Sequence, residues 1–137
     1  MKQALAEAQY AFDADEVPVG AVVVCRNTII ARAHNQTELL NDVTAHAEIL
    51  AVTAAANHLG SKFLNECTLY VTLEPCLMCA GALFWAQLGT LVYGAHDEKR
   101  GYVQLNRPVL HPKTQVVSGI LQSESALLLS NFFRRKR

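Results

Sequence analysis

Residues 68–79 read TLYVTLEPCLMC, and this stretch holds the end of one expected element and the start of the next. The first six residues are apolar or β-branched at both alternating sets of positions, which predicts a strand buried on both faces. Helices must then cover both faces of the sheet that contains it. Pro75 follows the strand after Glu74, and it is well placed in the first turn of a helix. We therefore expect a layered α/β domain in which this strand leads straight into a helix.

Outward from this stretch, the apolar spacing alternates between helical and strand patterns. Residues 20–33 read as a hairpin with its turn at Arg26-Asn27, and Thr44 and Ser123 are suited to cap helices. The 137 residues are expected to form one domain, 1–137, in which helices and a five-stranded mixed sheet build a three-layer α/β/α fold. We expect helices at 1–15, 45–59, 75–88 and 124–133 and strands at 20–25, 28–33, 68–73, 90–93 and 114–118.

The composition is typical of a globular protein. Hydrophobic residues make up 51% of the chain and charged residues 18%, which argues against disorder. No apolar run approaches the ~18–20 residues that a membrane-spanning helix needs. The first residues, MKQALAEAQYAFDADE, are amphipathic and acidic, which is typical of neither a signal peptide nor a transit peptide. We therefore expect a cytoplasmic protein with no membrane partner.

Charge is distributed unevenly although the formal net charge is zero. Residues 1–96 contain four Lys/Arg and nine Asp/Glu, whereas residues 97–137 contain eight Lys/Arg and three Asp/Glu. The chain ends in Arg134-Arg135-Lys136-Arg137. A basic end on an acidic body can bind an anionic partner such as nucleic acid. The alternative is a solvated C-terminal tail, which such runs of charge usually form.

The residues that carry chemistry lie at two expected helix starts. His46 and Glu48 stand in the otherwise apolar TAHAEIL at 44–50, and both are expensive to bury unless something pairs with them. Cys76 and Cys79 lie three residues apart on one face of the other helix. Helix N-termini favour anions and should lower the pKa of both thiols. One histidine and two cysteines form a three-ligand set for Zn²⁺ that leaves a position open for water, as in catalytic zinc sites.

Taken singly, these residues also have plainer interpretations. The C-x-x-C pair could be a redox pair, the histidine could be hydrogen-bonded in the core, and Glu48 could stabilise a helix dipole. Cys25 or Cys67 could supply a fourth ligand to a structural zinc, although both are expected on strands. The combined pattern, H-x-E followed by P-C-x-x-C, is far more specific, because it is the signature of zinc-dependent nucleobase deaminases. Beside a zinc-activated water, Glu48 would carry protons to a substrate nitrogen.

The chain resembles the bacterial tRNA adenosine deaminases, which convert the wobble adenosine of an anticodon to inosine. Segments along nearly the whole chain carry this resemblance: EVPVGAVVV at 16–24, TAHAEIL at 44–50, LYVTLEPCLMCAGAL at 69–83, VYGAHDEKRG at 92–101, and ALLLSNFF with the basic residues after it. The resemblance implies a cytidine deaminase-like fold, one Zn²⁺ per subunit, a homodimer, and a tRNA anticodon stem-loop as partner. The chain departs from the family after Gly101, where many members have a longer stretch of small residues.

By the same resemblance, His46, Cys76 and Cys79 hold the zinc, and Glu48 is the proton shuttle of a hydrolytic deamination. A zinc-bound hydroxide would attack C6 of adenine, while Glu48 would protonate N1 and then assist the departure of ammonia. Further positions match family residues that contact the target nucleoside or the anticodon loop around it: Asn35, the backbone N–H of Ala47, Val19, Asp97, His111 and Phe133. Trp85, on the cysteine helix, is expected to be a packing residue.

Two other functions stay open on the sequence. A free-base or nucleoside deaminase that acts on guanine, cytosine or a related ring would use the same zinc and the same glutamate, so the motif alone does not choose the substrate. A non-catalytic RNA-binding or zinc-stabilised structural module would have no need of Glu48. The basic C-terminal third and the GAHDEK segment at 94–99 favour RNA.

Overall fold

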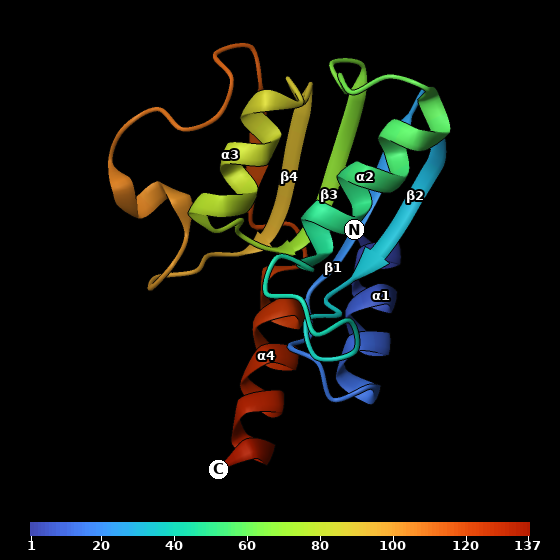
Figure 1. Cartoon of the computed structure of the whole chain (residues 1–137). Coiled ribbons are helices and arrows are strands. Elements are labelled where there is room, and N and C mark those ends of the chain that lie inside the picture. The colour runs from blue at the N-terminus through green and yellow to red at the C-terminus, as the bar shows by residue number, and fades with distance from the viewer.

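One mixed sheet forms the centre of the computed structural model, which describes all of residues 1–137 (Figure 1). Across the sheet, the order is β2 (Thr28–His34), β1 (Gly20–Cys25), β3 (Cys67–Leu73), β4 (Thr90–Ala95) and β5 (Gln115–Ser118). Strand β1 is antiparallel to both of its neighbours, and it forms the expected hairpin with β2. Strands β3, β4 and β5 are parallel. The expectation of a five-stranded mixed sheet is therefore confirmed.

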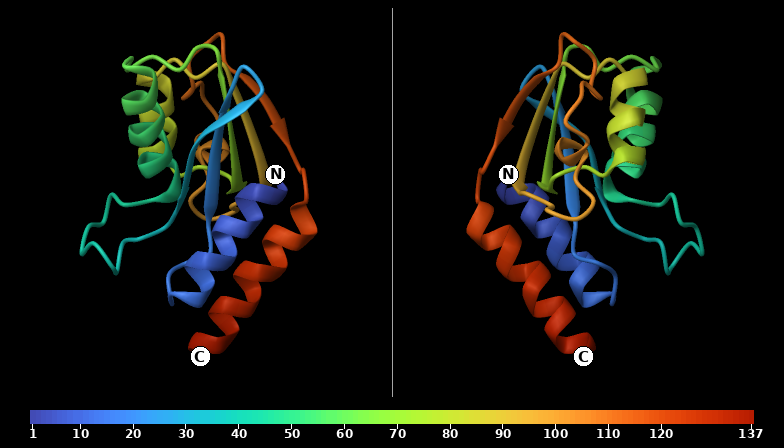
Figure 2. Two further views of the ribbon diagram at one scale, coloured as in Figure 1. Left: turned by 90° about the vertical axis from the view of Figure 1, so that its right-hand side faces the viewer. Right: turned by 90° about the vertical axis from the view of Figure 1, so that its left-hand side faces the viewer.

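Helices cover both faces of this sheet, as the apolar strand β3 predicted. Helices α2 (Ala47–Leu59) and α3 (Leu77–Trp85) lie on one face, and α1 (Lys2–Asp13) and α4 (Gln122–Lys136) lie on the other, as the two views of Figure 2 show. Leu69 and Val71 on one side of β3 are fully buried, and Thr72 on its other side is buried as well. The three-layer α/β/α fold is confirmed. None of its helices has both the length and the apolar composition that crossing a bilayer requires.

Small residues set how closely the helices approach the sheet. The buried face of α1 consists of Ala4, Ala8 and Ala11, and the buried face of α2 is likewise rich in alanine. Gly20 of β1 lies so close to α1 that a Cβ at this position would overlap the backbone of Ala4 and Ala8. The contact between α1 and β1 therefore requires glycine. Packing this close leaves the helix layers little freedom to shift against the sheet.

Two expected helix caps are wrong. The N-cap of α2 is His46, which is extended with φ −73° and ψ 152°. Thr44 instead donates both its backbone N–H and its hydroxyl to Asp42 Oδ1, a local bond that competes with a helix cap. Helix α4 follows Leu121, so Ser123 lies inside its first turn rather than before it.

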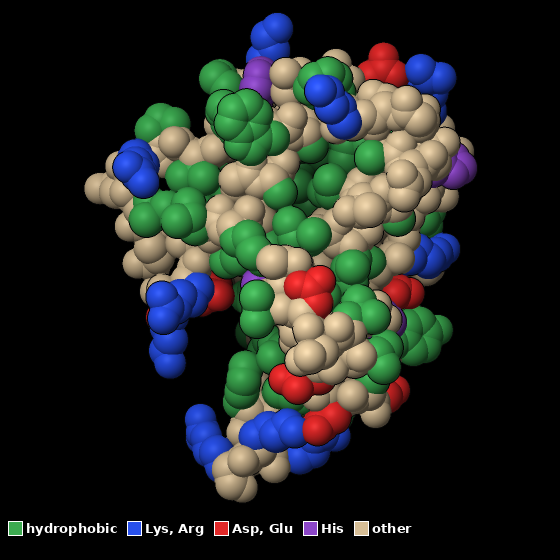
Figure 3. All heavy atoms as spheres, viewed as in Figure 1, with side chains coloured by type: hydrophobic (Ala, Val, Ile, Leu, Met, Phe, Trp, Pro, Cys, Tyr) green, Lys and Arg blue, Asp and Glu red, His purple; other side chains and the backbone are tan.

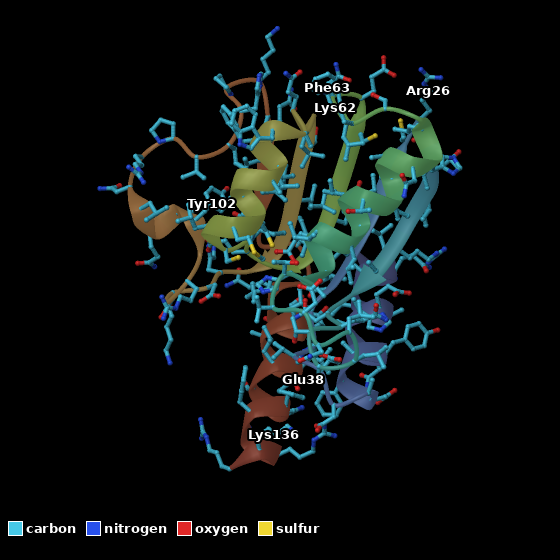
Figure 4. The ribbon with its side chains drawn as sticks, viewed as in Figure 1. Arg26, Glu38, Lys62, Phe63, Tyr102 and Lys136 are labelled. Atoms are coloured by element: carbon cyan, nitrogen blue, oxygen red, sulfur yellow. The ribbon has the colours of Figure 1, made fainter.

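The basic C-terminus is part of a packed helix. Phe132 of α4 contacts Phe12 of α1 edge-on, with ring centroids 6.0 Å apart. Arg135 and Lys136, in the last turn of α4, both pair with Asp15 just after α1, and Lys136 Nζ lies 2.6 Å from Asp15 Oδ2. Figure 4 places Lys136 near the free end of α4, away from the sheet. These two cations therefore lie on a helix and form surface ion pairs, in which their side chains stay partly exposed to solvent.

Candidate metal centre and active site

Three side chains that can ligate a metal converge where α2 and α3 begin. His46 is the N-cap of α2 and Cys76 is the N-cap of α3, whereas Cys79 lies in the first turn of α3. Figure 4 shows sulfur atoms between the starts of these two helices. Only Glu74 and Pro75 separate the end of β3 from Cys76, so the strand fixes where the cysteines lie. The structure thus brings the predicted ligands together, although two of them precede their helices.

The ligand atoms have the separations that a single tetrahedral Zn²⁺ imposes. His46 Nδ1 lies 3.7 Å from Cys76 Sγ and 3.5 Å from Cys79 Sγ, and all three ligand atoms lie within 4.8 Å of one another. Zinc–sulfur bonds of ~2.3 Å and zinc–nitrogen bonds of ~2.0 Å at a tetrahedral angle place nitrogen and sulfur about 3.6 Å apart. The donor set therefore fits Zn²⁺, and Nδ1 is the histidine nitrogen that faces the sulfurs.

The two thiols differ in pKa. The Cys79 thiol donates a hydrogen bond to Cys76, and this contact lowers the pKa of Cys76 to about 4. The same contact, together with burial, raises the pKa of Cys79 above its ordinary value. The expectation that both values are lowered is thus wrong for Cys79, because an adjacent thiolate and burial outweigh the helix dipole. Two sulfurs this close both become thiolates only when a cation binds between them.

Glu48 is the buried acid of this site. It is 4% exposed, and burial raises the pKa of its carboxyl to about 7. A spacing of two residues within a helix would turn His46 and Glu48 to different faces. Because His46 is extended rather than helical, both side chains line one cavity. A carboxyl with a pKa near 7 can both accept and release a proton at neutral pH.

A cavity of about 490 Å³ contains the ligands and Glu48 in its wall. This volume falls in the range of sites for small molecules, so it suits one nucleoside rather than a folded RNA. The wall is built by the segment before β1, the loop after β2, the starts of α2 and α3, and the loop after β4. Its residues are Val17, Val19, Asn35, Thr37, His46, Glu48, Leu73, Glu74, Cys76, Leu77, Met78, Asp97 and Arg100.

Asn35 forms hydrogen bonds with two other predicted substrate residues, Val19 and Ala47. Its backbone N–H donates to Val19 O at 3.1 Å, and its side-chain Oδ1 accepts the backbone N–H of Ala47 at 2.8 Å. Asn35 and Val19 both line the cavity. Ala47 does not line it, and its N–H, which we expected to contact the base, already has a partner in Asn35. In this arrangement Ala47 orients Asn35 instead of meeting the substrate.

The remaining predicted residues are only partly gathered at the site. Asp97 lines the zinc cavity. Phe133 lines a neighbouring groove that shares Asp97 and three further wall residues with it. His111 is placed elsewhere: it lines a separate cavity, and its ring centroid lies 6.0 Å from that of Phe84 on α3. His111 is therefore not part of the zinc cavity, and its expected contact with the anticodon loop stays a prediction.

The other two cysteines take no part in this site. Cys25 of β1 and Cys67 of β3 pair directly across the sheet, and they line a cavity that contains none of the three ligands. The only group of candidate metal ligands consists of His46, Cys76 and Cys79. A structural zinc with a fourth cysteine ligand is therefore not supported.

Sequence reasoning missed two buried acids beside the cavity. Glu16 and Glu74 are 2% and 3% exposed, and Glu74 also lines the cavity wall. Each acid stands near a proline at one end of an apolar strand. Glu16 lies two residues before Pro18 in EVPVG, and Glu74 lies directly before Pro75 in EPC. An acid at the border of a buried strand is expensive unless donors surround it, and this rule could have identified them.

Known proteins are similar to this chain in sequence and in fold. A sequence model of the MafB19-like deaminase family matches residues 1–137. The tRNA-specific adenosine deaminase of Agrobacterium fabrum is 49% identical over 142 residues, which cover 100% of this chain and 93% of that protein. The chain belongs to the tRNA-specific adenosine deaminase family. The expected family is thus confirmed over the whole length of the chain.

Solved structures relate this deaminase to two kinds of enzyme. A structure from work on A-to-I editing by tRNA:A34 deaminases matches with a TM-score of 0.88 and 48% identity, covering 94% of this chain and 97% of that one. A guanine deaminase from Nitrosomonas europaea matches with a TM-score of 0.81 and 26% identity, covering 96% of this chain and 81% of that one. The fold is therefore common to deaminases whose names give different substrates, and the identity is higher with the tRNA group.

Removing the imidazole should remove the metal. We expect His46→Ala to lose most of its zinc, because two sulfurs alone do not complete a stable zinc site. The measurement is zinc content by mass spectrometry after dialysis against a weak chelator. His58→Ala, the same substitution at an exposed position near the other end of α2, is the matched control and should keep its zinc. Full zinc content in His46→Ala would contradict the ligand assignment.

Proposed function

We propose that this chain deaminates the wobble adenosine of a tRNA to inosine, using zinc and Glu48. The observation that carries the proposal is the meeting of a buried carboxyl with three zinc-type ligands in the wall of one cavity. It occurs in a chain that is 49% identical to a tRNA-specific adenosine deaminase. A purely structural zinc site would not need the buried carboxyl of Glu48 beside its ligands, whereas a deaminase needs it to transfer protons.

Glu48 has two proton transfers to perform. The reaction replaces the amino group at C6 of adenine with an oxygen from water, and it releases ammonia. A zinc ion held by His46, Cys76 and Cys79 would lower the pKa of a water molecule to about 7. Glu48 would accept one proton of that water and deliver it to N1 of the ring. It would then take the second proton from the oxygen added at C6 and pass it to the amino nitrogen, which leaves as ammonia.

Asn35 is suited to hold the base in place. Because its Oδ1 accepts the Ala47 N–H, the orientation of the side-chain amide is fixed. Its amide NH₂ is then left to donate to a ring nitrogen of a purine in the cavity. Val19 supplies an apolar wall beside it. One polar group of fixed direction next to an apolar wall is a common way to orient a flat ring.

A cationic groove next to the cavity supports RNA as the substrate. The groove measures about 600 Å³ and is lined by Val17, Leu73, Asp97, Lys99, Arg100, Leu129, Phe133, Lys136 and Arg137. Its four cations can contact phosphates. Phe133 is half exposed and can stack on an unpaired base. A target base that leaves the anticodon stack would enter the zinc cavity while the rest of the loop stays in the groove.

The substrate is tested by direct comparison. We expect inosine at the wobble position of an anticodon stem-loop, and no ammonia from guanine, cytosine or free adenosine, because the groove cations can act only on a substrate with phosphates. The measurements are nucleoside mass spectrometry for the RNA and ammonia release for the free bases. The alternative function is that of a free-base deaminase, which the structural similarity to a guanine deaminase supports. Ammonia from a free base with unchanged RNA would refute the proposal in favour of that rival.

Glu48→Gln separates an enzyme from a zinc-stabilised module. Glutamine keeps the shape of the side chain but cannot carry a proton, so we expect deamination to fall by about 10²–10⁴-fold with zinc content unchanged. Single-turnover rates and zinc analysis measure the two properties. Glu124→Gln, at an exposed position in the first turn of α4, is the control and should act like wild type. An unaltered rate in Glu48→Gln would remove the proton-shuttle mechanism.

We also propose that the enzyme works in the cytoplasm as a homodimer joined through the α2–α3 face. Figure 3 shows hydrophobic side chains gathered over these two helices. Leu77, Met78 and Trp85 of α3 are exposed, and Trp85 is 77% exposed. Trp85, which we expected to be a packing residue, is therefore not buried within one chain. An exposed apolar face of this kind is typical of a protein contact, and tryptophan is common at the centre of such contacts.

A charge on this face should separate the subunits. We expect Trp85→Glu to be monomeric at micromolar concentration, because burying a carboxylate in an apolar contact is strongly unfavourable. Light scattering during size-exclusion chromatography gives the mass. Tyr10→Glu, at an exposed aromatic residue of α1 in the opposite layer, is the control and should leave the dimer intact. A wild-type protein with the mass of one chain would overturn the proposal.

A further inference from the structure

We propose that Glu16 and Glu74 are positioning residues that fix the two loops walling the zinc cavity. Neither residue belongs to the metal ligands, and neither carries protons in the proposed reaction. Each is nearly fully buried, and each offers both carboxylate oxygens to backbone N–H groups of a loop on the cavity wall. The choice of RNA as the test substrate rests on the proposed function, whereas the loop contacts do not.

Glu74 holds the loop that follows β4. Its Oε1 accepts the backbone N–H of Asp97 at 3.1 Å, and its Oε2 accepts the backbone N–H of Val103 at 3.0 Å. One carboxylate thereby joins two positions six residues apart. Asp97 and Arg100, which lie in this loop, line the cavity. The position of both side chains at the cavity therefore depends on Glu74.

Gly101 shows how closely this loop covers the carboxylate. A Cβ at this position would overlap Glu74 Oε2 and the backbone oxygen of Asp97. The same part of the loop is tied to the start of α3, because Tyr102 N–H donates to Pro75 O at 3.0 Å and Gly101 forms a bridge with Cys76. The loop is thus held against a buried acid and against the backbone of a metal ligand. Glycine is required there by this approach rather than by a turn.

Glu16 holds the loop that follows β2 in the same way. Its Oε1 accepts the backbone N–H of Glu38 at 3.0 Å and the Thr37 hydroxyl at 3.4 Å, and its Oε2 accepts the backbone N–H of Leu39 at 2.8 Å. Figure 4 labels Glu38 on this loop. Thr37 lines the zinc cavity, and Asn35 precedes it by two residues. Glu16 therefore anchors the segment that carries the base-orienting amide.

Apolar burial contributes little at the exposed parts of these loops. Leu39, Leu40 and Val43 are exposed, so the loop after β2 gains little from apolar burial. In the loop after β4, Lys99, Arg100 and Val103 are likewise exposed. Buried carboxylates are expensive unless N–H donors surround them. The fold can bury both acids because the loops supply those donors. In turn, a loop that moved away would leave its buried carboxylate without hydrogen bonds, and this cost favours the observed loop conformation.

The test weakens each carboxylate without changing its size. Glutamine has one acceptor oxygen and an NH₂ group that cannot accept an N–H, so Glu74→Gln and Glu16→Gln each leave one loop N–H without a partner. For Glu74→Gln we expect hydrogen exchange to rise by about tenfold or more within residues 97–103. For Glu16→Gln we expect the same rise within residues 37–39. Neither variant should raise exchange in the other loop.

The catalytic readout separates positioning from stability. Both variants should raise KM for the anticodon stem-loop on the order of tenfold, with a smaller change in kcat and with zinc content unchanged. Glu66→Gln, at an exposed glutamate beside Arg26, is the matched control and should change neither exchange nor KM. If exchange and KM of both variants match wild type, or if exchange rises while KM stays the same, the positioning role is overturned.

Gly101→Ala is a second route to the same loop. It leaves Glu74 intact but adds the Cβ that pushes the loop off the carboxylate, so it should reproduce the exchange and KM changes of Glu74→Gln. Wild-type behaviour of this variant would overturn the assignment for Glu74. Should the wild-type enzyme act on a free base instead of RNA, the proposed function fails. The hydrogen-exchange results would still show whether each carboxylate stabilises its loop. KM would then be measured with that base.

Discussion

The convergence of three metal-ligating side chains and a buried carboxyl at the starts of α2 and α3 is the constraint on which the rest of the structure depends. Glu48 is almost fully buried, and the sulfurs of Cys76 and Cys79 lie within hydrogen-bonding distance of His46 Nδ1. Helix N-termini favour negative charge at this point, but two thiolates and a carboxylate together would need a bound cation as well. The fold must therefore deliver three ligands to one point, and the geometry of the sheet does so. Strand β3 runs directly into the cysteine helix, and the α2 layer packs beside it through alanine contacts.

The residues that line the cavity come from two kinds of structural element. The ligands and Glu48 come from helix starts that are packed against the sheet, whereas Thr37, Asp97 and Arg100 come from loops with little apolar burial. Such loops can vary without disturbing the metal centre, because rigid elements hold the chemistry and hydrogen bonds hold the walls. A guanine deaminase that is 26% identical to this chain has a similar fold, with a TM-score of 0.81. A shared fold of this kind does not fix the substrate, which depends on the residues that line the cavity and the groove beside it.

The sequence predicted most of the elements because their patterns are local. The strand TLYVTL, the turn at Arg26-Asn27 and the proline before the cysteine helix each follow from neighbouring residues. The errors share a cause, which is competition that no local pattern reveals. Thr44 lost its capping role to Asp42, and Trp85 proved exposed. The lowered pKa expected for Cys79 failed because a second sulfur lies beside it.

The sequence by itself determined the fold class, and it identified the three candidate metal ligands and Glu48 as the candidate proton carrier, because residue type and short spacing are enough to select them. Only the tertiary structure decided which residues share the cavity. It placed Asn35 in hydrogen-bonding contact with Ala47, and it placed His111 at a different cavity. It also showed that Glu16 and Glu74 accept hydrogen bonds from the surrounding loops. These contacts span residues far apart in the chain, and a hydrogen bond depends on distance and angle in space rather than on separation in sequence.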